Sequence, residues 1–117
     1  MWTGEVKAHI EGLKAPATDF VLFGIEAHVC VTQTCLDLIE EGHRVHVVCD
    51  GVSSQKPFDR AVALQRMQKA GAFLTTAEQV VLQLLHSADH PSFKAVSSLV
   101  KQRSKDGENA FLSMASL

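Results

Sequence analysis

A chain of 117 residues with 46% apolar residues can form one small domain, or part of a larger one, around a real core. Thirteen acidic and eleven basic residues give a net charge of −2, so neither nucleic acid nor an anionic membrane is an expected partner. No stretch approaches the roughly 18 consecutive apolar residues of a membrane span, and the first residues lack the pattern of a signal or transit peptide.

The first elements alternate between helix and strand. Residues 4–13 carry apolar side chains at i, i+4 and i+7 spacing, which predicts a short amphipathic helix. The apolar run 20–24 is too short for a buried helix and predicts a strand that is covered on both faces. From Ala27 the apolar period becomes helical, and Gly42 supplies the C-terminal stop.

The middle of the chain repeats this alternation. Residues 45–49 predict a second strand, and Pro57 opens a helix that Gly71 ends. A third strand is expected over residues 72–74. The following helix is expected to begin with a capping box, in which Thr75 caps the helix and Glu78 lies three residues on.

The last predicted element is a helix that begins at Pro91. Beyond about residue 103 the apolar pattern disappears. Residues 1–103 are therefore expected to be folded as part of one domain, and residues 104–117 to be a disordered tail.

Short apolar strands that alternate with helices predict an α/β fold, with a parallel sheet and helices on both of its faces. Three strands make a small sheet. A strand as apolar as 20–24 is normally central, which leaves one of its edges without an evident partner. A protein partner or a second copy of the chain could use this exposed sheet edge.

Cys30 is the position best suited to chemistry. It follows a strand's carboxyl end, where ligands of parallel sheets bind, and it falls in the first turn of a predicted helix. Unpaired amides and the helix dipole favour a thiolate there, and the same amides could hold an oxyanion. The alternative is that Cys30 is an ordinary core residue on the apolar stripe of its helix, and spacing alone favours that alternative. Cys35 and Cys49 are expected to be structural.

Four segments together resemble the isochorismatase-like hydrolases. The first is Gly24-Ile25-Glu26-Ala27-His28-Val29-Cys30-Val31, with Leu36-Asp37-Leu38 further on, and the second is the strand and Asp…Ser loop of residues 45–54. Residues 73–78 and 89–94 complete the set, and the resemblance covers roughly residues 4–103.

The resemblance implies a three-layer α/β/α sandwich around a parallel sheet, of which this chain would be the C-terminal half. It also implies a Cys nucleophile that works with an Asp base and a Lys on an amide or related carbonyl. Cys30 matches the nucleophile. The family's non-proline cis peptide would be Ile25–Glu26, next to Ala27, and the amides of Glu26 and Cys30 would face the oxyanion.

No Asp or Lys of this chain stands at a position that matches the family's base or lysine. The chain alone is therefore expected to be inactive or nearly so, and the sequence leaves open whether it acts as an enzyme. The alternative is a non-catalytic α/β module that acts through protein–protein interaction. The small-molecule substrate is not implied by the motifs.

Other candidate sites are weaker. His43 and His46 straddle a turn and a strand, while His86 and His90 flank a helix end that Pro91 breaks, so no metal site is expected. There is no glycine-rich nucleotide motif, and no cofactor is expected. His28 lies two residues from Cys30, where helical geometry directs the two side chains about 200° apart. Three cysteines favour a reducing compartment and a cytoplasmic location, with the nucleus and the mitochondrion as alternatives.

Overall fold

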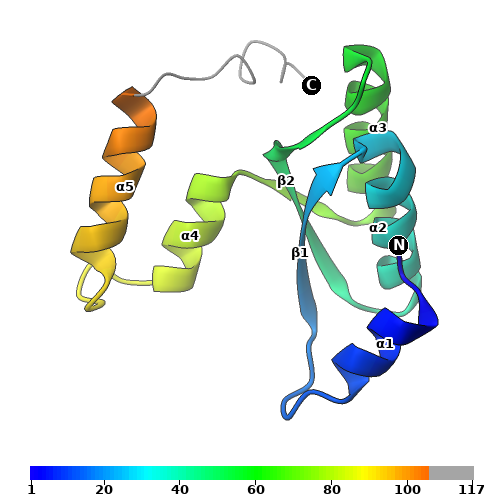
Figure 1. Ribbon diagram of the computed structural model, residues 1–117, viewed down its shortest axis with the longest axis horizontal. Helices are drawn as coiled ribbons and strands as arrows, with labels where there is room; N and C mark the ends of the chain where they lie inside the picture. Colours follow the sequence, from blue (N-terminus) through cyan, green and yellow to red (C-terminus); the bar gives the residue numbers. More distant parts are fainter. Residues whose placement is uncertain (106–117) are drawn as a thin grey trace.

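The structure is a computed structural model that describes residues 1–105 (Figure 1). In chain order the elements are α1 (Gly4–Glu11), β1 (Asp19–Ile25), the π-helical turn η1 (Ala27–Val31), α2 (Thr32–Glu40), β2 (Arg44–Ser53), α3 (Pro57–Ala70), β3 (Phe73–Thr75), α4 (Ala77–Leu85) and α5 (Phe93–Lys105). The predicted alternation of helices and strands is confirmed. The predicted tail lies mostly outside the described residues, and α5 continues two residues past the expected limit of 103.

Within residues 1–105 the strands form one parallel sheet in the order β1-β2-β3. β2 is therefore the central strand, and β1, the more apolar strand, lies at an edge. Side chains along β1 alternate between exposed and half-buried positions, so one face of this strand is left uncovered by the residues that the structure describes. The expectation that this strand is covered on both faces is thus wrong for these residues.

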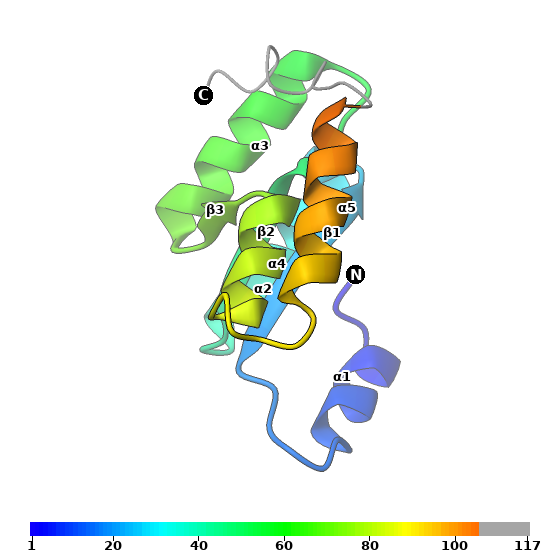
Figure 2. The same ribbon diagram turned by 90° about the vertical axis from the view of Figure 1, so that its left-hand side faces the viewer.

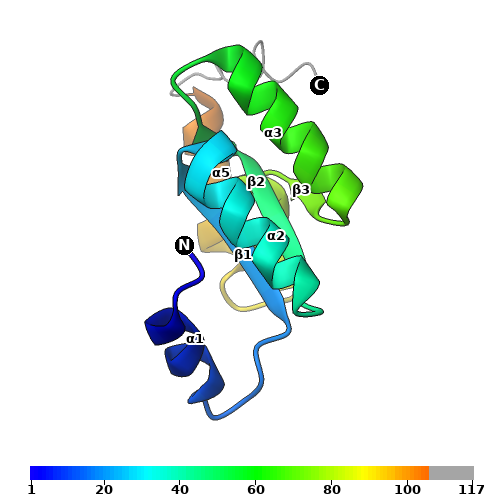
Figure 3. The same cartoon turned by 90° about the vertical axis from the view of Figure 1, so that its right-hand side faces the viewer.

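Helices lie on both faces of the sheet, as expected for the α/β class. α2 and α3 pass in front of the strands in Figure 3, and α4 and α5 in Figure 2. α4 packs on β2, and α5 contacts α4. None of the helices over residues 1–105 is long and apolar enough to cross a membrane.

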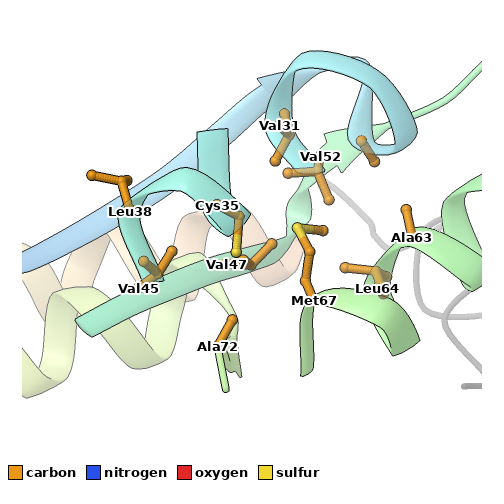
Figure 4. Packing of buried hydrophobic residues seen from close by; sticks show 11 residues of the cluster. Val31, Cys35, Leu38, Val45, Val47, Val52, Ala63, Leu64, Met67 and Ala72 are labelled. Atoms are coloured by element: carbon orange, nitrogen blue, oxygen red, sulfur yellow. The ribbon is translucent and has the colours of Figure 1, made fainter. Parts of the chain in front are cut away.

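The core lies between the sheet and the layer of η1, α2 and α3 (Figure 4). Its buried apolar side chains are Ala27, Val31, Cys35, Leu38, Val45, Val47, Val52, Ala63, Leu64, Met67 and Ala72. The opposite face has no comparable core. α4 and α5 contain no fully buried residue, and Leu84, which the apolar pattern of its helix would turn inward, is exposed.

The pairing of β2 with β1 is interrupted in the middle of β2 and resumes at Val52. Leu22 pairs with Val47, but two residues later Gly24 pairs with Val52, so residues 48–51 bulge out of the ladder with β1, while Val48 still pairs with Thr75 of β3. A Cβ on Gly51 would lie 3.1 Å from side-chain atoms of Phe23 and Val48, so any larger residue would require these neighbours to shift by a few tenths of an ångström. The bulge directs Asp50 out of the ladder.

The start of α4 differs by one residue from the predicted capping box. Thr76 caps the helix, because its Oγ1 accepts a hydrogen bond of 3.2 Å from the Gln79 amide. Thr75 is buried as the last residue of β3. The predicted partner Glu78 lies on the exposed side of the first turn.

Replacing Thr76 by Ala is expected to lower the free energy of unfolding by about 1 kcal/mol, the usual cost of losing a threonine cap. Glu78→Ala, two residues away in the same turn, is the matched control and should change it by less than about 0.5 kcal/mol. Urea denaturation followed by circular dichroism measures both values. A larger loss for Glu78→Ala would contradict the assignment of Thr76 as the cap.

Candidate active site

The site is built where β1 ends. Gly24 has a φ of +129°, which favours glycine, and the peptide bond between Ile25 and Glu26 is cis, at the position that the family resemblance implies. The chain then enters η1 instead of the α-helix that the sequence pattern predicts. The Glu26 carbonyl accepts hydrogen bonds from the amides of both Val29 and Val31.

The π-helical turn changes which side chains face the core. Because the turn is wider than an α-helical turn, the buried stripe runs through Ala27, Val31, Cys35 and Leu38, and Cys30 lies beside it. Cys30 is half-buried and touches the edge of the core. The Thr32 hydroxyl, which donates to the Ala27 carbonyl at 2.6 Å, closes the turn.

The Cys30 thiol points back to the carboxyl end of β1. Its Sγ lies 3.0 Å from the Ile25 carbonyl oxygen and 3.9 Å from that of Glu26. It also lines a cavity of about 140 Å³ between β1 and α2. Both carbonyls can accept a hydrogen bond only from the protonated thiol, so these two contacts are lost when a thiolate forms.

The other two cysteines lie away from this cavity. Cys35 is fully buried in the core, and burial raises the pKa of its thiol to about 11. Burial also raises the pKa of Cys49, in the middle of β2. Neither thiol faces the cavity next to Cys30.

Two side chains of residues 24–31 form hydrogen bonds with the loop that follows β2. The Glu26 carboxylate accepts a hydrogen bond of 2.9 Å from the Gln55 amide, and His28 Nδ1 lies 2.8 Å from the Ser54 hydroxyl. Neither side chain forms a hydrogen bond with Cys30. Helical spacing predicted that His28 would not reach Cys30, but no sequence pattern indicated the contacts with Ser54 and Gln55.

The comparisons with known proteins agree with this geometry. Residues 7–79, which include the whole Cys30 segment, match the model of the isochorismatase domain. The chain belongs to the isochorismatase family.

Two members of known name show how much of the chain is similar to the family. The chain is 44% identical to isochorismatase domain-containing protein 2 of Xenopus laevis over 106 residues, which are 91% of this chain and 51% of that protein. It is 43% identical to the secreted isochorismatase effector Isc1 of Phytophthora sojae, over 90% of this chain and 50% of the effector.

Among solved structures, the MAR1 ribonuclease of Caenorhabditis elegans superposes with a TM-score of 0.77 and 44% identity. The match covers 86% of this chain and 50% of that one. The chain thus spans about half the length of each of these three proteins.

A second polar cluster surrounds Asp50, outside the ladder of β2. Its carboxylate accepts hydrogen bonds from the Ala77 amide at the start of α4, at 2.8 Å, and from Arg103 of α5, at 2.7 Å. Burial raises the pKa of the Asp50 carboxyl, but the hydrogen bonds outweigh it and leave the pKa below its ordinary value. Asp50 therefore ties both helices of the outer layer to the sheet.

Replacing Asp50 by Asn should remove about 1–2 kcal/mol of stability at pH 7, since hydrogen bonds to a charged group are lost. The pKa of Asp50 is lower in the folded chain than its value of about 3.9 in the unfolded chain. The stability that Asp50 contributes is therefore fully present above the unfolded pKa and is lost as the pH falls through the folded pKa. The stabilities of wild type and Asp50→Asn should therefore converge below about pH 4. Thermal melts between pH 2 and 7 test this, with the exposed Asp37→Asn as control, and parallel curves over the whole range would contradict it.

The histidines are not brought together. His43 packs edge-on against Trp2 and Phe20, while His46 stacks on Phe73 and bonds to Asp19 at 3.0 Å. Hydrogen bonds from Arg44 and His46 hold the pKa of Asp19 below its ordinary value. Among residues 1–105, no group of three His, Cys, Asp or Glu side chains could hold a metal ion.

Proposed function

We propose that this chain supplies the nucleophile of an isochorismatase-type cysteine hydrolase site that acts on an amide or a related carbonyl. The observation that carries this proposal is the position of Cys30. Its thiol is half-buried at the carboxyl end of β1 and lines a cavity of about 140 Å³. Cys35, a core cysteine of the same helical segment, has none of these features.

The proposed reaction is acyl transfer through a thioester. The Cys30 thiolate forms a bond to the carbonyl carbon, and the resulting oxyanion is held by amides of the Ile25–Ala27 turn and of Cys30 itself. The base that removed the proton from the thiol gives it to the nitrogen, the carbon–nitrogen bond breaks, and the amine leaves. Water cleaves the thioester, which releases the acid and restores the thiol.

The Cys30 thiol needs a base, and residues 24–31 do not offer one. Glu26 and His28 are their acidic and imidazole side chains, and both are engaged by the loop that follows β2. We therefore expect the chain by itself to form an acyl-enzyme only with activated substrates. Turnover of amides would require a carboxylate from polypeptide beyond this chain.

Acylation by p-nitrophenyl acetate tests the proposal. The chain should release a burst of about one equivalent of nitrophenolate, and mass spectrometry should place the acetyl group on Cys30. Cys30→Ala should abolish the burst, and Cys49→Ala, the matched control, should leave it unchanged. A burst that survives Cys30→Ala, or acetylation elsewhere, overturns the proposal, and release of ammonia from a panel of primary amides should stay at background.

The relative from C. elegans is named a ribonuclease, so single-stranded RNA belongs in the same panel. We expect neither binding nor cleavage, because a net charge of −2 gives no electrostatic attraction for a phosphate backbone. Cleavage that is lost in Cys30→Ala would replace the amide by RNA as the substrate class. The three free cysteines are consistent with a reducing compartment, and we propose a cytoplasmic location.

The alternative is a non-catalytic module that works through a protein partner. It is favoured by the exposed apolar side chains along β1. An absence of any acylation, together with stable association through β1, would favour this alternative over the hydrolase.

A further inference from the structure

The loop between β2 and α3, residues 54–56, is joined to the turn before Cys30 by a carboxylate. The pairing of β1 with β2 ends at Ile25 and Ser53. Beyond that point, among residues 1–105, none of the backbone hydrogen bonds outside the helices and strands joins η1 to this loop. The Glu26 carboxylate makes the connection instead, because it accepts a hydrogen bond of 2.9 Å from the backbone amide of Gln55.

Glu26 is held through both its backbone and its side chain. Its backbone carbonyl accepts hydrogen bonds from the amides of Val29 and Val31, with which η1 begins, while its carboxylate binds the loop. Gln55 directly precedes Lys56, the N-cap of α3. The positive end of that helix dipole therefore adds an electrostatic attraction for the carboxylate.

We propose that Glu26 is a positioning residue for the Cys30 site, because it fixes the backbone of residues 25–27 against the loop that follows β2. This inference rests on the proposed acyl transfer. The Glu26 carboxylate bonds to the loop and not to the thiol, so it acts through the amides that would hold the oxyanion. Such amides are effective only when they point at the oxyanion before its charge develops, and a misplacement of about 1 Å costs up to about 100-fold in rate.

Two reactions of Cys30 distinguish the positioning of these amides from the activation of the thiol. Acylation by p-nitrophenyl acetate forms a bond from sulfur to the carbonyl carbon, places negative charge on the carbonyl oxygen and then expels p-nitrophenolate. Alkylation by iodoacetamide forms a bond from sulfur to a saturated carbon, expels iodide and creates no oxyanion. Both reactions need the thiolate, so the ratio of their rates reports on the amides.

Glu26→Ala should slow the acylation of Cys30 at least about tenfold and change its alkylation by less than about twofold. Glu26→Gln should be acylated within about threefold of the wild-type rate, because its side-chain oxygen still accepts a hydrogen bond from the Gln55 amide. Glu40→Ala removes an exposed carboxylate at the end of α2 and is the matched control, which should change neither rate. Stopped-flow absorbance measures acylation, and mass spectrometry of the labelled peptide measures alkylation.

Glu26→Asp decides the question if Glu26→Ala does not fold. Aspartate keeps the charge but is one methylene shorter, so its oxygens no longer reach the Gln55 amide. It should therefore slow acylation as much as Glu26→Ala does. The contact of His28 with the Ser54 hydroxyl is present in every variant, so the far-UV circular dichroism spectra should match that of the wild type.

The variants and the wild type fail in different ways if the inference or the proposed function is wrong. Acylation of Glu26→Ala at the wild-type rate overturns the inference, and so does an equal decrease of acylation and alkylation, which would show an effect on the thiol. Glu26→Gln as slow as Glu26→Ala would make Glu26 a proton-transfer group and overturn its positioning role. A wild-type chain that is alkylated but not acylated at Cys30 overturns the proposed function, and this inference with it.

Discussion

Replacing Arg60 by Met is expected to lower the free energy of unfolding by about 3 kcal/mol, among the largest effects of a single substitution in this chain. Arg60 of α3 is 3% exposed. Its guanidinium donates to the carbonyls of Val52, at 3.1 Å, and of Cys49, on either side of the bulge in β2. Met keeps most of the aliphatic volume but leaves both carbonyls without this donor.

The loss should be measurable in several ways. A domain of this size loses about 4–8 °C in melting temperature for each kcal/mol, so a decrease well above 10 °C is expected. The bulge carries Asp50, which holds α4 and α5, so the amides of these helices should also exchange faster with solvent. Arg66→Met, an exposed arginine of the same helix, is the control and should cost less than about 0.5 kcal/mol. Equal losses for the two variants would contradict a specific role of Arg60.

The second large effect is expected for Leu64→Ala. Leu64 has no exposed surface and lies in the centre of the core between α3 and the sheet (Figure 4). Removing a buried leucine side chain costs the transfer free energy of the lost methyl groups and leaves a cavity, together about 3 kcal/mol. Urea denaturation should show this loss with an unchanged m-value.

Val62→Ala, two residues earlier on the exposed side of α3, provides the comparison and should cost less than about 1 kcal/mol. The contrast depends on the core lying on the α2–α3 face of the sheet. If Val62→Ala cost as much as Leu64→Ala, that side of α3 would have to be covered, and the assignment of the core to one face would be wrong.

Local patterns predicted the order of the elements because each depends on neighbours in the chain. α3 begins at Pro57 and ends before Gly71 as predicted, since proline at the first position and a glycine of positive φ are signals of the backbone itself. The apolar run of β1 and the helical period after Ala27 likewise predicted a strand followed by a helix. The family was correctly identified from such local segments.

The same patterns gave wrong predictions at two places, where a shift of a single residue decides the local structure. A helical period of 3.6 placed Cys30 on the buried stripe, whereas the extra residue of the π-helical turn moves it beside that stripe. The threonine pair before α4 offered two possible caps. Thr75 belongs to β3, and Thr76 is therefore the residue left to cap the helix.

By itself, the sequence determined that this chain is α/β, that it belongs to the isochorismatase family, and that Cys30 follows the first strand. Only the tertiary structure decided which groups meet across the chain. Asp50 reaches Ala77 and Arg103, Glu26 holds Gln55, and Arg60 is buried against β2. The physical reason is that periodicity records whether a side chain is buried, but it carries no information on which distant hydrogen-bonding partner satisfies it.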